Sequence, residues 1–301
     1  MPEGLSDPTK RASLAGGVRV PRMNMQPQTS ITESLVEVEN LTHTYRHAAR
    51  RALDTVSLAI QPGQIAALVG HNGAGKTTMI RIMTGVLRPT AGSVRLAGRA
   101  LYQDRVQMAA AKRLTGVVAD NPPLYGRLTA REFVRFSARI YGLADSPHLE
   151  RRISDLLASV ELDEDADRRI AGYSLGMRKK TAVCAALVHD PALLIMDEPF
   201  DGLDPLVRRS LKGALRAHAA RGRAVLLSTH ALELAQELCD RIIAIHRGRL
   251  IADGSVDDLR AIVGAVEDAP LEDVFFLLID RQRSILGAAA LAPGSETGVV
   301  S

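Results

Sequence analysis

A glycine-rich loop directly follows a short apolar run, and this pair constrains the fold of the chain more than any other feature. The run, Ile65–Val69, reads IAALV, and the loop, Gly70–Thr77, reads GHNGAGKT. An unbroken apolar run of this length is typical of a strand buried on both faces of a parallel sheet. A G-x-x-x-x-G-K-T loop lets backbone N–H groups wrap a phosphate chain without Cβ clashes. The pair therefore predicts an α/β fold that holds phosphate between a strand and a helix.

The residues around the end of the loop extend this prediction to ATP and a metal ion. We expect a helix over residues 77–87 that points its N-terminus at the phosphates. Lys76 would pair with the β- and γ-phosphates, and the Thr77 hydroxyl would bind Mg²⁺. The alternative is an accidental match in a glycine-rich turn, and the flanking strand and helix argue against it. The predicted nucleotide-binding residues are Gly70, Asn72, Gly73, Ala74, Gly75, Lys76, Thr77 and Thr78.

A second apolar run ends in two carboxylates. Leu193–Met196 is followed by Asp197 and Glu198. Ligands of open α/β sheets bind at the carboxyl ends of the strands, which is where both side chains would lie. We expect Asp197 to hold the magnesium, directly or through water, and Glu198 to act as general base toward the attacking water. Taken alone, a strand ending in Asp-Glu also fits a helix cap, and the phosphate loop favours the catalytic reading.

A third segment, Tyr173–Met177, reads YSLGM and opens a helix. By itself it is an N-cap serine with a nearby glycine. Its place upstream of the Asp-Glu strand makes the chain resemble the ABC ATPase family, in which LSGGQ occupies this position. Ser174 and Gly176 align with the motif's serine and second glycine, and the other three positions depart from it. The resemblance covers about residues 35–262, and the variant loop looks like that of a subgroup with many drug exporters.

The resemblance implies further roles for residues elsewhere in the chain. Asp204, in the segment 201–205, aligns with the acid of the family's D-loop, and His230 aligns with the switch histidine that senses the γ-phosphate. With Lys76 and Glu198, His230 completes the predicted catalytic set. Tyr45 stands where the family stacks an aromatic ring on adenine. Structural roles stay open for two of these residues: a lone histidine after a strand is usually structural, and Tyr45 would also fit a packed core.

Asp120 departs from the family pattern. It occupies the position of the Q-loop glutamine, which in the family links bound magnesium to the helical subdomain. The carboxylate is a hard oxygen donor, so one hypothesis makes Asp120 a magnesium ligand. The other hypothesis is that Asp120-Asn121-Pro122 serves only as a turn.

The chain as a whole is expected to be an α/β protein: a P-loop NTPase core with a mostly parallel sheet, an N-terminal antiparallel β region and an inserted helical subdomain. Thr129 and Glu132 predict a capping box at the start of a helix in that insertion, and Phe133, Phe136 and Ile140 fall on one face of it. The expected domains are a flexible leader (1–33), the ATPase domain (34–262, with its helical subdomain at about 121–175), and a short C-terminal helix with a disordered tail (263–301) that frays after about Ile279.

Composition limits the partners. The net charge is +4, aromatic residues make up 3% and tryptophan is absent, so we expect no nucleic acid partner. No apolar run approaches the ~18 residues that a membrane span needs. Cys184 and Cys239 fit reduced thiols of a cytosolic protein.

From the resemblance we expect the ATPase subunit of an ABC exporter, placed in the cytoplasm on the inner face of the cell membrane. One copy of each motif implies a homodimer or heterodimer of ATPase subunits, with a separate transmembrane permease subunit. An importer ATPase and a soluble, non-transport ABC ATPase remain the alternatives.

Overall fold

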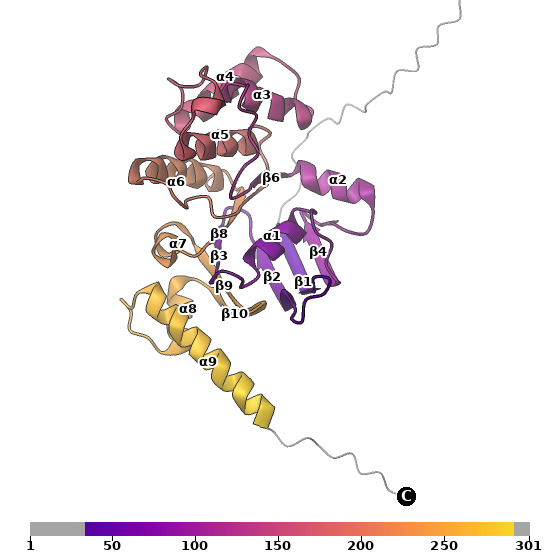
Figure 1. Ribbon diagram of the computed structural model, residues 1–301, viewed down its shortest axis with the longest axis vertical. Coiled ribbons are helices and arrows are strands. Elements are labelled where there is room, and N and C mark those ends of the chain that lie inside the picture. Colours follow the sequence, from indigo (N-terminus) through magenta and orange to yellow (C-terminus); the bar gives the residue numbers. More distant parts are fainter. Residues whose placement is uncertain (1–33, 292–301) are drawn as a thin grey trace, which may run out of the picture. The chain divides into compact units, whose positions relative to one another are not determined.

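The computed structural model describes residues 34–291 (Figure 1). The expected leader, 1–33, and the end of the expected tail, 292–301, lie outside the described residues. The described part contains two sheets with helices around them, which confirms the predicted α/β class.

The larger sheet has the strand order β10-β9-β3-β8-β7-β6, and all of its neighbours are parallel except β10 against β9. The smaller sheet, with the order β2-β1-β4-β5, is antiparallel throughout. The larger sheet consists of β3 (Ile65–Val69), β6 (Thr115–Val118), β7 (Leu193–Met196), β8 (Ala224–Thr229), β9 (Arg241–His246) and β10 (Arg249–Gly254). The smaller sheet consists of β1 (Val36–His43), β2 (Leu53–Ile60), β4 (Ala91–Leu96) and β5 (Arg99–Ala100).

The central strand β3 divides the hydrophobic interior into two cores. All five of its residues are buried, and successive side chains point to opposite faces of a strand. Ile65, Ala67 and Val69 join the core shared with the helical region. Ala66 and Leu68 join the core shared with the antiparallel sheet. The unbroken apolar run is therefore required by burial on both faces.

The helix after the phosphate loop, α1 (Lys76–Met83), is shorter than the expected span to residue 87. The Thr84 hydroxyl donates a hydrogen bond to the Ile80 carbonyl, and Gly85 adopts a positive φ of 68°. A left-handed glycine after the last turn ends a helix by bonding its free carbonyls. The chain then runs through β4, β5 and α2 (Arg105–Arg113) into β6.

Three helices, α3 (Ala130–Ile140), α4 (Pro147–Ser159) and α5 (Leu175–Leu187), pack together beyond β6 (Figure 1). The short 3₁₀ helix η1 (Ile170–Gly172) precedes α5. The predicted capping box at Thr129 and Glu132 is confirmed.

The apolar face predicted for α3 is partly buried only at Phe133, which packs against the core. Ala130, Val134 and Ala138 are buried, whereas Phe136 and Ile140 are 40% and 67% exposed. Small alanine side chains let α3 approach α5 closely, and Phe136 and Ile140 are left on the outside.

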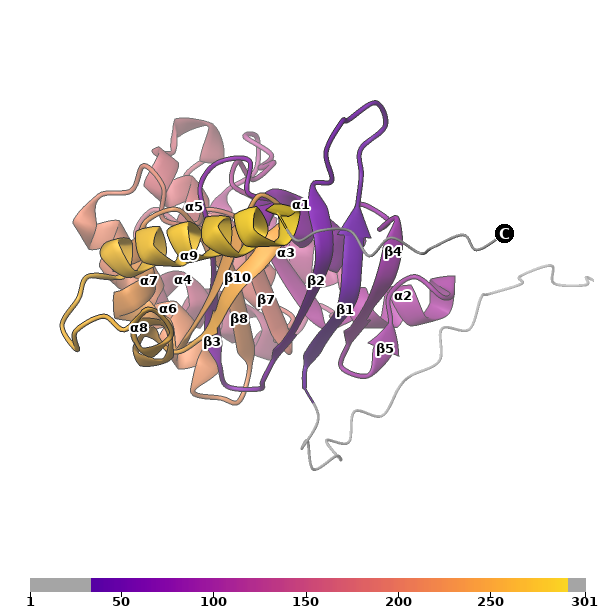
Figure 2. The same cartoon turned by 90° about the horizontal axis from the view of Figure 1, so that it is seen from below.

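After α5, the described part of the chain contains four more helices, with β7 before them and β8, β9 and β10 between them: α6 (Pro205–Ala219), α7 (Leu232–Leu238), α8 (Val256–Val263) and α9 (Leu271–Leu291). The last helix continues well past Ile279, where fraying was expected. Its first turns are anchored by buried Val274, Phe275 and Leu278, and Ala288–Ala290 are strong helix formers. Figure 2 shows α9 running past α8 and β10, both of which it contacts.

Both cysteines are buried, and burial raises the pKa of the Cys184 and Cys239 thiols to about 12. Within residues 34–291, no helix combines the length and the apolar character needed to span a membrane.

Candidate active site

The phosphate loop connects β3 to α1 and borders a cavity of about 410 Å³. The backbone conformation and close packing of the loop require its glycines. Gly73 and Gly75 have φ values of 78° and 113°, which other residues rarely adopt. A Cβ on Gly70 would lie 2.4 Å from the Ile245 carbonyl oxygen. Gly70 therefore packs against β9 and does not line the cavity. The residues that line the cavity are Tyr45, Ala52, His71, Asn72, Gly73, Ala74, Gly75, Lys76, Thr77, Thr78, Asp120, Asp197 and Glu198.

Lys76 ties this loop to the carboxyl edge of the sheet. Its side chain is buried, and its Nζ donates a hydrogen bond to the Gly70 carbonyl at 2.7 Å. The same Nζ lies 3.3 Å from Oε1 of Glu198. The cation expected to meet the phosphates therefore already faces the predicted general base.

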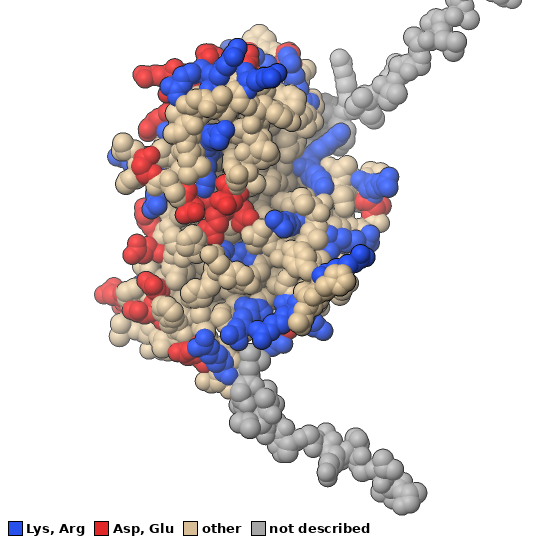
Figure 3. Space-filling view, in the orientation of Figure 1, with Lys and Arg blue, Asp and Glu red and all other residues tan. Residues whose placement is uncertain are grey.

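Strand register brings the two carboxylates beside β8. Because Met196 pairs with Leu227 in the parallel ladder, the next residues, Asp197 and Ser228, lie side by side. The Ser228 hydroxyl donates to Oδ1 of Asp197 at 2.6 Å and accepts the Glu198 amide N–H at 2.9 Å. Acidic side chains gather in the middle of the face drawn in Figure 3. Sequence reasoning missed Ser228, although its place at the end of the strand beside β7 was the signal.

His230 reaches the other oxygen of the same carboxylate. Its Nδ1 is 3.1 Å from Oε2 of Glu198. Glu198 thus lies between Lys76 on Oε1 and His230 on Oε2. Its backbone has a positive φ of 44°, a conformation that costs free energy for a residue with a Cβ. The carboxylate position is therefore fixed by contacts from two separate segments of the chain, the phosphate loop and the end of β8.

Tyr45 faces this cavity and is 38% exposed, so it is not a core residue. Its hydroxyl is 3.2 Å from the Thr78 hydroxyl on α1, and its ring meets the edge of the His43 ring with centroids 4.7 Å apart. The ring is therefore held next to the phosphate loop. Stacking of adenine on Tyr45 stays a prediction.

Asp120 lies at the rim of the cavity and is 60% exposed. Its carboxylate is 3.7 Å from Nζ of Lys179 on α5. Lys179 is buried, with 3% of its side chain exposed, and donates to the carbonyls of Glu198 (2.8 Å) and Asp201 (3.1 Å). It therefore clamps the backbone of the turn that carries Glu198. No sequence pattern singled out Lys179, since a lysine in a helix usually faces solvent.

Besides Gly70, three predicted nucleotide-binding residues lie outside this cavity. Ser174 and Asp204 are N-caps, accepting the amide N–H groups of Met177 and Val207 respectively. A Cβ on Gly176 would lie 3.0 Å from a Val207 methyl group, so glycine is needed there for packing. These residues have local structural roles, and the chain's own phosphate loop does not meet them.

The residues around the phosphate loop are compatible with magnesium. Thr77, Asp120 and Asp197 all border the cavity and offer the hard oxygen donors that Mg²⁺ prefers. In the described part of the chain, no three His, Cys, Asp or Glu side chains come close enough together to hold a metal ion by themselves. Phosphate oxygens would therefore have to complete the coordination.

Comparison with known proteins identifies the family of the chain. The ABC transporter family profile matches residues 53–201. The ABC-type transporter ATP-binding protein EcsA of Bacillus subtilis is 35% identical over 81% of this chain and 96% of its own length. The Nod factor export ATP-binding protein I of Paraburkholderia xenovorans is 36% identical over 76% of this chain and 73% of its own length.

Solved structures give the same result. An ATP-binding subunit of an ABC transporter superimposes with a TM-score of 0.75 at 34% identity, covering 82% of this chain and all of that one. A dimeric ATP-binding cassette bound to ADP and phosphate superimposes with a TM-score of 0.65 at 26% identity, over 73% of this chain and 98% of that one. The chain is therefore an ATP-binding subunit of the ABC transporter family.

Proposed function

We propose that this chain hydrolyses ATP to drive an exporter whose transmembrane permease is a separate subunit. The observation that carries the proposal is the single cavity in which Lys76, Asp197 and Glu198 meet, with His230 against Glu198. The names of relatives in Nod factor export and, in Escherichia coli, probable multidrug transport support the exporter direction.

The roles of the side chains follow from their contacts. The β- and γ-phosphates of ATP would replace Glu198 as the partner of Lys76 and leave the carboxylate free to polarise a water molecule. His230, within hydrogen-bond distance of that carboxylate, would orient Glu198 and the water. Thr77, Asp197 and Asp120 would hold Mg²⁺, which neutralises phosphate charge when bound. Tyr45 would contact adenine at the rim.

A second ATPase subunit would complete the site. Ser174 and Gly176 lie outside the cavity of their own chain, and Leu175 between them is exposed. A helix N-terminus with a hydroxyl group favours an anion, so the start of α5 would cap the γ-phosphate held by the other subunit, and Asp204 would lie at the same interface. The partner would be a second copy or a related cassette, and two ATP molecules would lie between them.

The permease would dock on the outside of the helical region. Tyr125, Phe136 and Ile140 are exposed there, and the Tyr125 and Phe136 rings are 5.6 Å apart. Grouped, exposed apolar side chains mark a partner surface. Beside them lies a cavity of about 340 Å³, which is lined by Val117, Pro122 and Phe133 among others. Pro122 follows Asp120 by two positions in the sequence. The subunit would then work in the cytoplasm, on the inner face of the cell membrane.

Replacing the general base tests hydrolysis directly. Glu198→Gln keeps the size of the side chain but cannot accept the proton, so ATP binding should be retained while turnover falls roughly 10²- to 10⁴-fold. Nucleotide binding and phosphate release by the purified chain measure the two effects. Glu233→Gln, an exposed carboxylate on α7, is the matched control and should keep wild-type turnover. Wild-type turnover in Glu198→Gln would refute the assignment.

Lys179 provides a test of how the turn is held. Lys179→Met keeps the aliphatic volume but leaves the Glu198 and Asp201 carbonyls without their donor. Because Glu198 would then shift, we expect kcat to fall roughly 10- to 100-fold with little change in ATP affinity. The control is Lys180→Met, also buried, whose ammonium contacts the Glu161 carbonyl instead. Equal losses in both variants would mean that Lys179 only supports the fold.

Variants of Asp120 show whether this residue is a magnesium ligand or only a turn residue. If its carboxylate binds the metal, turnover of the wild-type chain should depend more steeply on free Mg²⁺ than turnover of Asp120→Gln, because clustered carboxylates repel one another without the metal. Magnesium titrations of ATP hydrolysis measure this difference. Unchanged magnesium dependence in Asp120→Gln and Asp120→Ala would leave Asp120 with only its contact to Lys179.

A further inference from the structure

A strongly basic cavity lies behind the phosphate loop. It has a volume of about 280 Å³ and is formed by the segment before β2 and the start of β2, the β9–β10 turn, and residues 282–283 of α9. Basic side chains gather at the end of the molecule in Figure 3 where β9, β10 and α9 meet in Figure 1. The charged residues that line it are Arg50, Arg51, Arg247, Arg249, Arg283 and Asp54.

The charge in this cavity is not balanced. Its lining contains five arginines and one aspartate, and the only further carboxylate printed against one of these arginines in the described residues is Asp280, 3.2 Å from Arg283. Asp54 already accepts hydrogen bonds from Arg51 at 2.6 Å and from Arg249 at 2.7 Å, and these bonds hold the pKa of Asp54 below its usual range. Arg50 and Arg247 have no carboxylate partner among the described residues.

His246 lies in the same positively charged surroundings. This side chain lines the cavity, and its two buried ring nitrogens have no hydrogen-bond partner within residues 34–291. Burial lowers the pKa of His246, and the nearby Arg247 and Arg283 guanidinium groups lower it further. An additional cation is therefore disfavoured here, and an anion is favoured.

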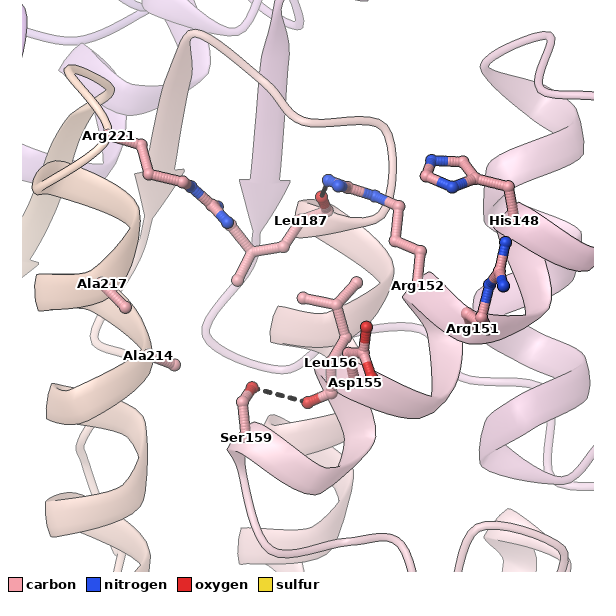
Figure 4. Close-up of a pocket in the computed structure, with 10 residues that line it drawn as sticks. All are labelled: His148, Arg151, Arg152, Asp155, Leu156, Ser159, Leu187, Ala214, Ala217 and Arg221. Atoms are coloured by element: carbon pink, nitrogen blue, oxygen red, sulfur yellow. Dashed lines mark hydrogen bonds between the residues drawn. The ribbon is translucent and has the colours of Figure 1, made fainter.

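A second arginine-lined cavity, between α4 and α6, provides a contrast (Figure 4). There Arg152 donates to the carbonyls of Leu187 and Val188 at the end of α5. Arg221 lies 3.1 Å from Nδ1 of His218 and 3.7 Å from Asp190. Arg152 and Arg221 are thus occupied in holding helices together. With Arg151 and Asp155 also in its lining, that cavity carries three arginines and one aspartate, a smaller positive excess than the basic cavity.

The basic cavity is separate from the nucleotide site but shares a wall with it. The Gly248 amide N–H donates to the Ala74 carbonyl of the phosphate loop, and its own carbonyl accepts the Asp54 amide N–H, both at 2.8 Å. Ala52 borders the nucleotide cavity, and the adjacent Arg51 borders the basic one. A ligand in the basic cavity would therefore lie behind the loop and leave the nucleotide site open.

We propose that this cavity is a second anion site, which binds the phosphate group of a small ligand or of a lipid headgroup. The planar fork of arginine donors matches phosphate oxygens two at a time. The cavity is near the lower end of the volumes of small-molecule sites, about 300 Å³, which suits a phosphate or pyrophosphate group. ATP hydrolysis by Glu198 does not depend on this site, so either proposal can fail alone.

The test uses the full chain with Lys76→Ala, which weakens phosphate binding at the P-loop. Calorimetric titration with inorganic pyrophosphate at low salt should show saturable binding, and adding Arg50→Gln and Arg247→Gln should weaken it roughly tenfold or more. Both arginines are exposed, so these changes should leave the fold intact. The matched control adds Arg105→Gln and Arg113→Gln, two exposed arginines of α2 that remove the same charge.

Vesicles identify the source of the phosphate. Sedimentation with phosphatidylglycerol vesicles, compared with phosphatidylcholine vesicles, measures headgroup binding by the same variants. Loss of pyrophosphate binding in the Arg50/Arg247 variant, but not in the Arg105/Arg113 control, supports a soluble ligand. Loss of phosphatidylglycerol binding in the Arg50/Arg247 variant, but not in that control, supports a lipid. Binding that is absent from both assays, or that falls equally in the Arg105/Arg113 control, would overturn the proposal.

Discussion

The position of one carboxylate, that of Glu198, depends on nearly every part of this fold. Lys76 from the phosphate loop and His230 from the end of β8 contact its two oxygens. Ser228 accepts its backbone amide N–H, and Lys179 donates to its backbone carbonyl. A residue with a positive φ is kept in place only when its surroundings determine it, and such strain is typical of functional sites.

The parallel sheet makes these contacts possible. β3, β7 and β8 end at the same edge, and the pairing of Val69 with Thr229 sets the loop after β3 beside the segment that begins with His230. Burial of β3 on both faces fixes its register against two cores, since a slip of one residue would exchange their side chains. Packing in the interior thus determines the distance between Lys76 and Glu198 at the edge of the sheet.

The elements predicted best from the sequence were those with a strong local pattern. β3 and β7 begin and end where their apolar runs do, and the capping box of α3 is present. The roles of Ser228 and Lys179 could not be predicted, because each depends on a partner about 20 or 30 positions away. A polar residue in a strand or helix carries no local sign of such a contact.

Two predictions from apolar patterning went wrong for a related reason. Phe136 and Ile140 have the spacing of a buried face, but alanines make the close contact of α3. Periodicity gives the face of a helix and does not say whether a partner within the chain covers it. At the C-terminus, α9 continues through residues that looked like a fraying tail, because alanine favours a helix without needing burial.

The central claim is that Ser174 serves the nucleotide of another subunit while Lys76 serves its own. ATP hydrolysis by an equal mixture of Lys76→Ala and Ser174→Arg chains tests it most directly. A dimer of either variant has two defective ATP sites, whereas a dimer with one chain of each variant keeps one intact site. The account predicts two inactive variants whose mixture recovers about a quarter of wild-type activity, as expected for random pairing of two-fold dimers. A mixture no more active than either variant alone would contradict it.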